Sequence, residues 1–177
     1  DAFQIPRLIH QGVEADDILG TIARTAEAKG WDVRIVTGDK DLMQIVTDKV
    51  FLYDDLRVQR GAAAEPEVSE KDVLAKFGVP PNQVVDILAL AGDTSDNVPG
   101  VKGIGPKIAA ELVQKYGDLE SILAAAPEVK QKMRRQRLIE FAEMARLSKR
   151  LVTIDQHVDI EMSPEKALYK GPAREEL

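Results

Sequence analysis

Residues 32–53, DVRIVTGDKDLMQIVTDKVFLY, decide the fold class of this chain. Residues 32–37 alternate and are rich in β-branched side chains, which is typical of a strand, and Gly38 then turns the chain. A short helix is expected over 40–47, and a second strand over 50–53. Two strands joined by a short helix indicate an α/β domain.

The sequence upstream extends this pattern. Residues 15–29 carry Ile18, Ile22 and Ala26 at helical spacing, and Gly30 ends the predicted helix. Helix, strand, helix, strand in that order predicts a layered α/β domain with a parallel sheet. The first residues contain no clearly apolar strand, and most sheets have about five strands. We therefore expect the sheet to be incomplete at its N-terminal end.

Downstream of the strands the chain becomes mainly helical. Residues 57–68 are expected to form a loop or a weak hairpin, residues 151–154 a returning strand, and residues 161–177 a weakly structured tail. Proline and glycine punctuate a series of predicted helices. These helices cover residues 69–77, 81–91, 106–116, 118–126 and 128–147.

Composition excludes several classes of protein. The 177 residues include no cysteine and two histidines, which excludes disulfides, thiolate zinc sites and cysteine nucleophiles and disfavours a histidine-rich metal site. No apolar run approaches the roughly 18 residues that a membrane span needs, and the first residues lack the features of a signal peptide. We therefore expect a soluble intracellular protein and no membrane partner. The net charge of −6 disfavours a nucleic-acid partner at first, because phosphates repel acids.

The charge is unevenly distributed along the chain. Residues 1–100 hold 10 basic and 18 acidic side chains, whereas residues 101–150 hold 11 basic and 6 acidic ones. The tail from 151 to 177 is acidic again, with 3 basic and 6 acidic side chains. Such asymmetry indicates that the acidic and basic blocks have different roles.

Acidic side chains gather in three motifs: EADD at the start of the first helix, TGDKD after the first strand, and GDTSDN after an apolar helix. Each motif alone is explained by helix capping or an Asx turn. Three of them on loops that could converge favour seats for Mg²⁺ or Mn²⁺, and a pair of such ions suits phosphodiester cleavage. The candidate metal-ligating and catalytic residues are Glu14, Asp16, Asp17, Asp39, Asp41, Asp93 and Asp96.

The stretch VPGVKGIGPK at 98–107 lies between two predicted helices. Glycines allow close backbone approach, and free N–H groups at a helix start beside lysines can hold a phosphate. A nucleotide P-loop is disfavoured, because Ile108 stands where a Ser or Thr should hold Mg²⁺ and no strand precedes the motif. A tight interhelical turn is the structural alternative. The candidate DNA-binding residues are Gly100, Lys102, Gly103, Gly105 and Lys107.

Basic residues continue beyond this stretch. Each alone is typical of solvated helix surface, but as a set they could extend a phosphate-binding face. They are Lys115, Lys130, Lys132, Arg134, Arg135, Arg137, Lys149 and Arg150.

EADD, TGDKD and LALAGDTSDNVPGVKGIGPKIA, in that order, resemble the 5′→3′ exonuclease domain of bacterial DNA polymerase I, in the flap endonuclease superfamily. The resemblance implies a PIN-like parallel-sheet nuclease core over 1–68, lacking its N-terminal part, and a helical helix-three-turn-helix DNA-binding module over 69–150, with residues 151–177 as returning strand and tail. By resemblance, Glu14, Asp16 and Asp17 would serve a first metal site. Asp39, Asp41, Asp93 and Asp96 would serve a second, and backbone carbonyls of the hairpin would hold a potassium ion.

The resemblance further implies a structure-specific nuclease of replication and repair, cytoplasmic and nucleoid-associated in a bacterium. It would act as a monomer on duplex DNA with a 5′ flap, nick or gap, using two Mg²⁺ or Mn²⁺ ions, and could be fused to a polymerase domain. Two alternatives stay open. One is a DNA-binding fragment that lacks a complete metal site and is inactive alone. The other is a domain that uses a cation only for stability.

Overall fold

The computed structural model describes residues 3–55, 57, 65–161, 167–169 and 171. The chain forms two compact units. We call residues 1–33 with 154–177 the terminal unit, and residues 34–153 the central unit. None of the described helices combines the length and the apolar character that crossing a membrane would require.

The terminal unit is built on helix α1, Ala15–Ala28, which confirms the helix predicted there. Gly30 follows it with φ +84°, a left-handed conformation that glycine adopts without strain. The segment after Ile154 lies against α1: the Thr21 hydroxyl and the Arg24 guanidinium donate to the carbonyls of Asp155 and Gln156. These contacts join the two sequence ends of the unit.

The central unit contains a small sheet with the strand order β1 (Val33–Val36), β2 (Val50–Tyr53), β3 (Glu67–Val68). The 3₁₀ helix η1, Asp41–Ile45, connects β1 to β2 in place of the predicted short helix over 40–47. Strands β1 and β2 confirm the predictions for 32–37 and 50–53.

The third strand is antiparallel, since β3 pairs with β2 and places Val68 opposite Leu52. The two strands form a hairpin of which β3 alone lies within residues 57–68, the stretch predicted as a loop or a weak hairpin. The part of that stretch over 58–64 lies outside the described residues. The hairpin follows from burial, because Leu52 and Val68 are each 1% exposed and share one face of the sheet.

Helices make up the rest of the central unit, and most of them match the predicted ranges. Ser69 and Asp72 form a capping box at the start of the first one. The helices are α3 (Glu70–Phe77), η2 (Pro81–Gln83), α4 (Val84–Ala91), α5 (Pro106–Tyr116), α6 (Leu119–Ala124), η3 (Ala126–Glu128), α7 (Lys132–Glu140) and α8 (Ala142–Val152).

Two predictions fail in the last part of this unit. The single helix expected over 128–147 is two helices, because Phe141 leaves helical geometry at φ −107°, ψ 21°. The strand expected over 151–154 is wrong, since α8 continues to Val152. The Gln44 amide donates to the Val152 carbonyl at 2.8 Å and so caps the helix, which overrides the local preference of LVTI for a strand.

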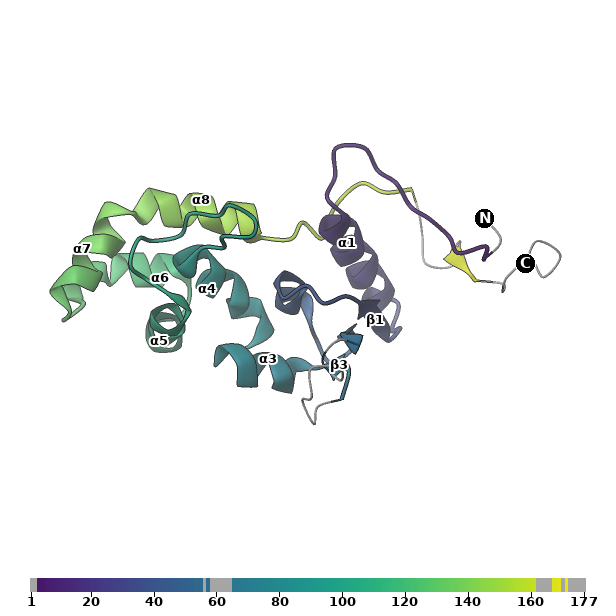
Figure 1. The fold of residues 1–177 in the computed structure, drawn as a ribbon, viewed down its shortest axis with the longest axis horizontal. Helices are drawn as coiled ribbons and strands as arrows, with labels where there is room; N and C mark the ends of the chain where they lie inside the picture. The colour runs from purple at the N-terminus through teal and green to yellow at the C-terminus, as the bar shows by residue number, and fades with distance from the viewer. Residues whose placement is uncertain (1–2, 56, 58–64, 162–166, 170, 172–177) are drawn as a thin grey trace. The chain divides into compact units, whose positions relative to one another are not determined.

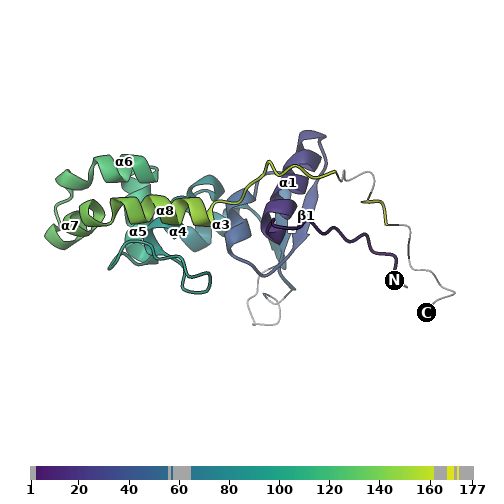
Figure 2. The same ribbon diagram turned by 90° about the horizontal axis from the view of Figure 1, so that it is seen from above.

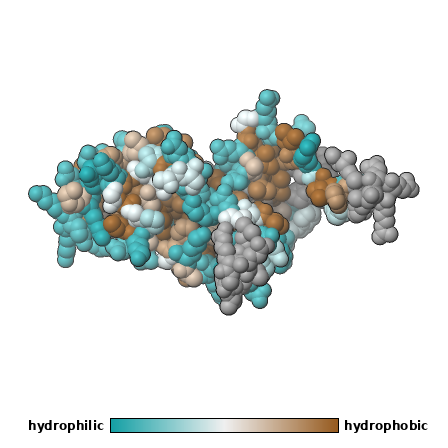
Figure 3. Space-filling model, viewed as in Figure 1, coloured by the Kyte–Doolittle hydropathy of each residue, from teal (hydrophilic) through white to brown (hydrophobic). Residues whose placement is uncertain are grey.

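Helix α4 is the centre of the core. It packs on α5 and α8, as Figures 1 and 2 show, and its residues Ile87, Leu88, Ala89 and Leu90 are at most 4% exposed. Hydrophilic side chains cover much of the face of this unit that Figure 3 presents. An apolar helix surrounded by amphipathic ones therefore supports the loops at both ends of α4.

A buried acid links three helices within this core. Asp86 on α4 is 3% exposed; its Oδ1 accepts from the Lys149 ammonium of α8 at 2.6 Å and from the Leu119 N–H of α6 at 3.0 Å. Near it, Glu120 pairs with Arg146 at the surface. Both ion pairs involve α8, but the carboxylate of Asp86 is buried whereas that of Glu120 is exposed.

We expect Asp86→Ala to lower the free energy of unfolding by about 3 kcal/mol, because it leaves a partly buried ammonium and a buried N–H without a partner. Glu120→Ala is the matched control and should change stability little, since an exposed pair is screened by water. Urea unfolding followed by circular dichroism measures both. Equal losses in the two variants would contradict the structural role of Asp86.

Candidate metal centre and backbone hairpin

Three aspartates of the central unit form an acidic cluster. Asp41 begins η1, Asp93 follows α4, and Asp96 lies in the loop after it. Carboxylate oxygens of the three, one from each, lie within 4.8 Å of one another. This group, which we call the acidic cluster, brings together two of the three predicted motifs.

Lys40 lies beside the cluster. Its ammonium donates to Asp93 Oδ2 and is 3.7 Å from Asp41 Oδ1. This hydrogen bond, followed by those from Ser95, holds the pKa of Asp93 at about 2, well below its ordinary value. Asp93 is thus an ionised carboxylate although its side chain is only 5% exposed.

Asp41 is perturbed in the opposite direction. Burial is the main cause that raises its pKa to about 6; Lys40 opposes this, and the nearby carboxylates add to it. Asp41 Oδ1 is buried and has no hydrogen-bond partner among the described residues. A buried oxygen without a partner, next to two further carboxylates, fits an all-oxygen site for a hard divalent cation.

The loop between Asp93 and Val98 holds two of the three acids in place. Asp93 and Val98 exchange two backbone hydrogen bonds of 2.9 and 2.7 Å, which form an isolated antiparallel bridge. Inside the loop, Asp93 Oδ1 accepts from the backbone N–H and the hydroxyl of Ser95. These bonds form an Asx turn. GDTSDN is therefore a turn, as one interpretation of its sequence predicted, and its two aspartates also belong to the acidic cluster, as the other predicted.

Asp39 is not a member of the cluster. It is exposed, and its Oδ1 accepts from the Asp41 N–H at 2.9 Å, while its own N–H donates to Thr37. The structural role considered for TGDKD, a turn with a cap, is therefore present at Asp39, and the ligand role is favoured at Asp41.

The acids of EADD belong to the terminal unit. Glu14 is the residue before α1, and Asp16 and Asp17 lie in its first turn. Asp17 Oδ1 accepts from the Asp155 N–H at 2.8 Å, which fixes that carboxylate on the C-terminal segment. A ligand role for these three residues stays a prediction.

The predicted hairpin lies between α4 and α5. Val101 and Ile104 are 2% exposed and anchor it in the core, while Lys102, Gly103 and Lys107 are exposed. The Val101 N–H donates to the Leu90 carbonyl at 2.8 Å. The exposed part, with the first turn of α5, presents backbone and lysines to solvent.

The base of the hairpin is a backbone crossing. Gly100, at φ +60°, donates its N–H to the Ser148 hydroxyl at 3.0 Å. A Cβ at Gly100 would clash with the backbone N of Gly92, and one at Gly92 would lie 2.7 Å from the Val98 carbonyl oxygen. Both positions require glycine because two backbone segments meet there.

Many of the basic residues after the hairpin pair with neighbours. Lys149 contacts Asp86, Arg134 contacts Glu111 at 2.8 Å, and Arg135 donates to the Val129 carbonyl. Arg137 bonds Glu140 and lies over the ring of Phe141. The wide phosphate-binding face considered for these residues is therefore weakened, and the hairpin itself is the better candidate.

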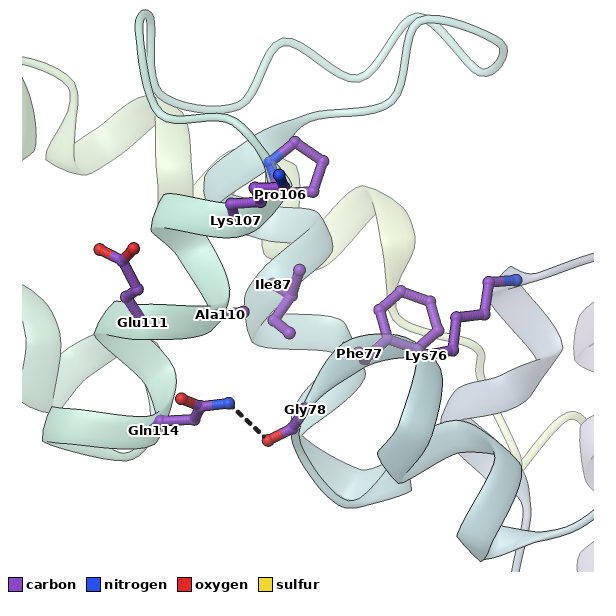
Figure 4. A pocket seen from close by; sticks show the side chains of 9 residues that line it. All are labelled: Lys76, Phe77, Gly78, Ile87, Pro106, Lys107, Ala110, Glu111 and Gln114. Atoms are coloured by element: carbon purple, nitrogen blue, oxygen red, sulfur yellow. Dashed lines mark hydrogen bonds between the residues drawn. The ribbon is translucent and has the colours of Figure 1, made fainter.

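An open pocket of about 380 Å³ lies between the end of α3 and the start of α5 (Figure 4). Pro106 and Lys107 lie at its α5 end, and the Gln114 amide donates to the Gly78 carbonyl across it at 2.7 Å. None of the acids of the cluster lines it. The chemistry of the site is thus placed outside this pocket.

Lys40, Ser95 and Ser148 also contact the site, and none of them was predicted from the sequence. A lysine between the two aspartates of TGDKD was a visible signal for Lys40. Ser148 carried no signal, because its contact with Gly100 spans 48 positions.

The chain is similar to known proteins along almost its whole length. Residues 1–78 match the family model for the 5′-3′ exonuclease, N-terminal resolvase-like domain, and residues 79–175 match that for the 5′-3′ exonuclease, C-terminal SAM fold. DNA polymerase I of Rhizobium leguminosarum is 45% identical over 161 residues, which is 91% of this chain and 15% of that protein. DNA polymerase I of Bacillus subtilis is 39% identical over 178 residues, 100% of this chain and 20% of that protein.

The chain therefore spans a fifth or less of the length of these relatives. Among solved structures, T5 5′-exonuclease with bound divalent zinc ions has a TM-score of 0.75 and 25% identity, covering 85% of this chain and 53% of the other. The catalytic core of Rad2 in complex with DNA substrate has a TM-score of 0.55 and 13% identity over 91% of this chain and 53% of the other, which is a likeness of fold.

The raised pKa of Asp41 predicts a pH dependence of stability without metal. The folded protein releases this proton at about pH 6, whereas the unfolded chain releases it near pH 3.8. Between these values the folded state binds more protons, so the free energy of unfolding falls as pH rises. Asp41→Asn should therefore gain stability relative to the parent as pH rises from 4.5 to about 7, measured by urea unfolding in chelator.

Asp72→Asn, in the capping box of α3, is the control for this measurement. The pKa of Asp72 is lowered to about 2, so its stabilising contribution is complete above the unfolded value and is lost only as pH falls toward 2. This variant should be less stable than the parent by a constant amount between pH 5 and 7. A pH-independent difference for Asp41→Asn as well would show that burial does not hold the Asp41 proton.

Proposed function

The chain belongs to the 5′-3′ exonuclease family, and from this membership and its acidic cluster we propose that it hydrolyses phosphodiesters near the 5′ end of a DNA strand at nicks, gaps or flaps. One observation carries the proposal: the acidic cluster and the hairpin at 100–107 share one scaffold. The loop with Asp93 and Asp96 and the hairpin at 100–107 are joined through the glycine crossing. The proposed metal site and the proposed DNA-backbone-binding site thus lie in one unit.

We assign the acidic cluster to one divalent ion, Mg²⁺ or Mn²⁺, with Asp41, Asp93 and Asp96 as ligands. Asp39 supports Asp41 by accepting a hydrogen bond from the Asp41 N–H. Glu14, Asp16 and Asp17 are proposed to hold the other. Such ions supply an activated water and neutralise charge on the phosphodiester. The residues of the chain orient the carboxylates, and the buried side of Asp41 restricts water on that face.

The hairpin is proposed to hold the DNA backbone. The N–H groups of the first turn of α5 have no side-chain cap, because the residue before the helix is Gly105. Together with Lys102 and Lys107 they offer donors and positive charge to a phosphate without contacting a base. Carbonyl groups of the same hairpin are proposed to hold a potassium ion against that phosphate.

We further propose that the chain acts as a monomer and is part of a DNA polymerase I in its parent protein. The relatives with that name extend far beyond the matched region. The alternative function, a DNA-binding fragment without a complete metal site, is separated from the nuclease by a cleavage assay.

Asp96→Ala should reduce Mn²⁺-dependent release of product from a 5′-labelled flap by more than about 100-fold, since even the outer partners of metal ligands are worth about 10- to 100-fold. Asp48→Asn, an exposed acid outside the cluster, is the matched control and should cleave like the parent. Flap binding in Ca²⁺ should be similar in all three proteins. Cleavage by Asp96→Ala at the parental rate would remove Asp96 from the site, and binding without cleavage by the parent would favour the DNA-binding fragment.

Lys107→Ala should weaken binding to duplexes of different sequence by a similar factor and reduce the salt slope of the binding constant by about 1. The reason is that a phosphate contact carries no sequence information but releases a counterion. Lys71→Ala on α3, which is also exposed, is the control with the same change of charge. A change of sequence preference in Lys107→Ala would contradict the backbone role of the hairpin.

A further inference from the structure

We propose that Lys40 is the resident counter-cation of the acidic cluster: its ammonium occupies the cluster before a divalent ion binds and is displaced from Asp93 when the ion arrives. The inference rests on the proposed function, because it assumes that a divalent ion binds at this cluster. It goes beyond that function in assigning Lys40, which is not one of the acids, a role in setting metal affinity.

The position of the ammonium is the first observation. Lys40 Nζ donates to Asp93 Oδ2 and lies 3.7 Å from Asp41 Oδ1, so it sits between two members of the cluster. Asp93 is buried, and a buried carboxylate without a partner is strongly destabilising. Lys40 therefore offsets the repulsion that otherwise opposes gathering these acids without metal.

The hydrogen bonds of Asp93 provide the second observation. Its Oδ1 is already occupied by the N–H and the hydroxyl of Ser95. Oδ2 is the oxygen bound by Lys40. A divalent ion that uses Asp93 while the Ser95 turn stays intact must take Oδ2. Two cations bound to one oxygen atom repel each other, so the divalent ion and the Lys40 ammonium compete for Asp93 Oδ2.

The third observation is that Lys40 can leave without unfolding the site. Its side chain is 40% exposed, whereas that of Asp93 is 5% exposed. The residue lies before η1, in helical geometry at φ −73°, ψ −23°, so its backbone is fixed and only its flexible methylene stem needs to turn. Asp41 and Asp93 keep their places on η1 and on the loop after α4 during this change.

The test compares Mn²⁺ affinity among variants of the chain by calorimetric titration. Lys40→Met, which keeps the stem and removes the charge, should bind Mn²⁺ roughly tenfold more tightly, because the ion no longer displaces an ammonium. Lys40→Arg keeps the charge and should bind like the parent. Lys130→Met, an exposed lysine between η3 and α7, makes the same charge change outside the cluster and should also bind like the parent.

Two further measurements keep the test decisive if Lys40→Met folds poorly. Without metal, this variant should melt at a lower temperature than the parent, and saturating Mn²⁺ should remove most of the difference. In the parent, acylation of the Lys40 amine, followed by mass spectrometry, should become faster when Mg²⁺ is added, since its bond to Asp93 is broken.

Unchanged or weaker Mn²⁺ binding by Lys40→Met, or slower acylation of Lys40 with Mg²⁺, would overturn the counter-cation role while leaving the metal site intact. Failure of the proposed function looks different. In that case the parent binds no Mn²⁺, or Asp93→Asn binds it as the parent does, whatever residue stands at position 40.

Discussion

The contact between Gly92 and Gly100 is the constraint on which the rest of the central unit depends. Two backbone segments meet there at a distance that leaves no room for a Cβ on either residue. One segment leads into the loop of Asp93 and Asp96, and the other leads into the hairpin. The Ser148 hydroxyl fastens this crossing to α8. The proposed metal centre and the proposed DNA-binding hairpin therefore share one rigid support, which is the preorganisation that a site of this kind needs.

The acidic cluster shows how one small region imposes opposite behaviour on similar carboxylates. Asp93 is the more buried side chain, yet its pKa is lowered, because Lys40 and Ser95 bond its charged form. Burial is the main cause that raises the pKa of Asp41, because one of its oxygens is buried without a donor, and the neighbouring acids add to the effect. Hydrogen bonds to the charged form lower the pKa of Asp93, whereas burial that such bonds do not offset raises the pKa of Asp41.

Local patterns predicted the features that depend on neighbouring residues. Helical spacing and a glycine stop identified α1, and Pro106 after a glycine-rich turn identified the start of α5. Features set by distant contacts were missed. The end of α8 depends on Gln44, more than a hundred positions away, and nothing in the local sequence marks the break at Phe141.

The same distinction applies to the candidate site. The resemblance placed TGDKD and GDTSDN in one metal site, and Asp41, Asp93 and Asp96 of these motifs lie close together in the structure. The sequence could not show which aspartate of TGDKD enters the cluster. The two differ because Asp39 Oδ1 accepts a hydrogen bond from the Asp41 N–H. The ion pair of Arg134 on α7 with Glu111 on α5 likewise depends on tertiary structure, and it weakens the case for that arginine in the predicted phosphate-binding face.

Helix α7 has a thin attachment to the core. Leu138 is its one buried side chain, and its other large apolar side chains, Met133 and Ile139, are 61% and 56% exposed. A helix with so little buried apolar surface opens at a small fraction of the cost of global unfolding. Amide hydrogens of α7 will thus exchange with solvent through local opening, while those of α4 exchange only when the whole unit unfolds. We therefore expect this basic helix to open without loosening the residues at the glycine crossing.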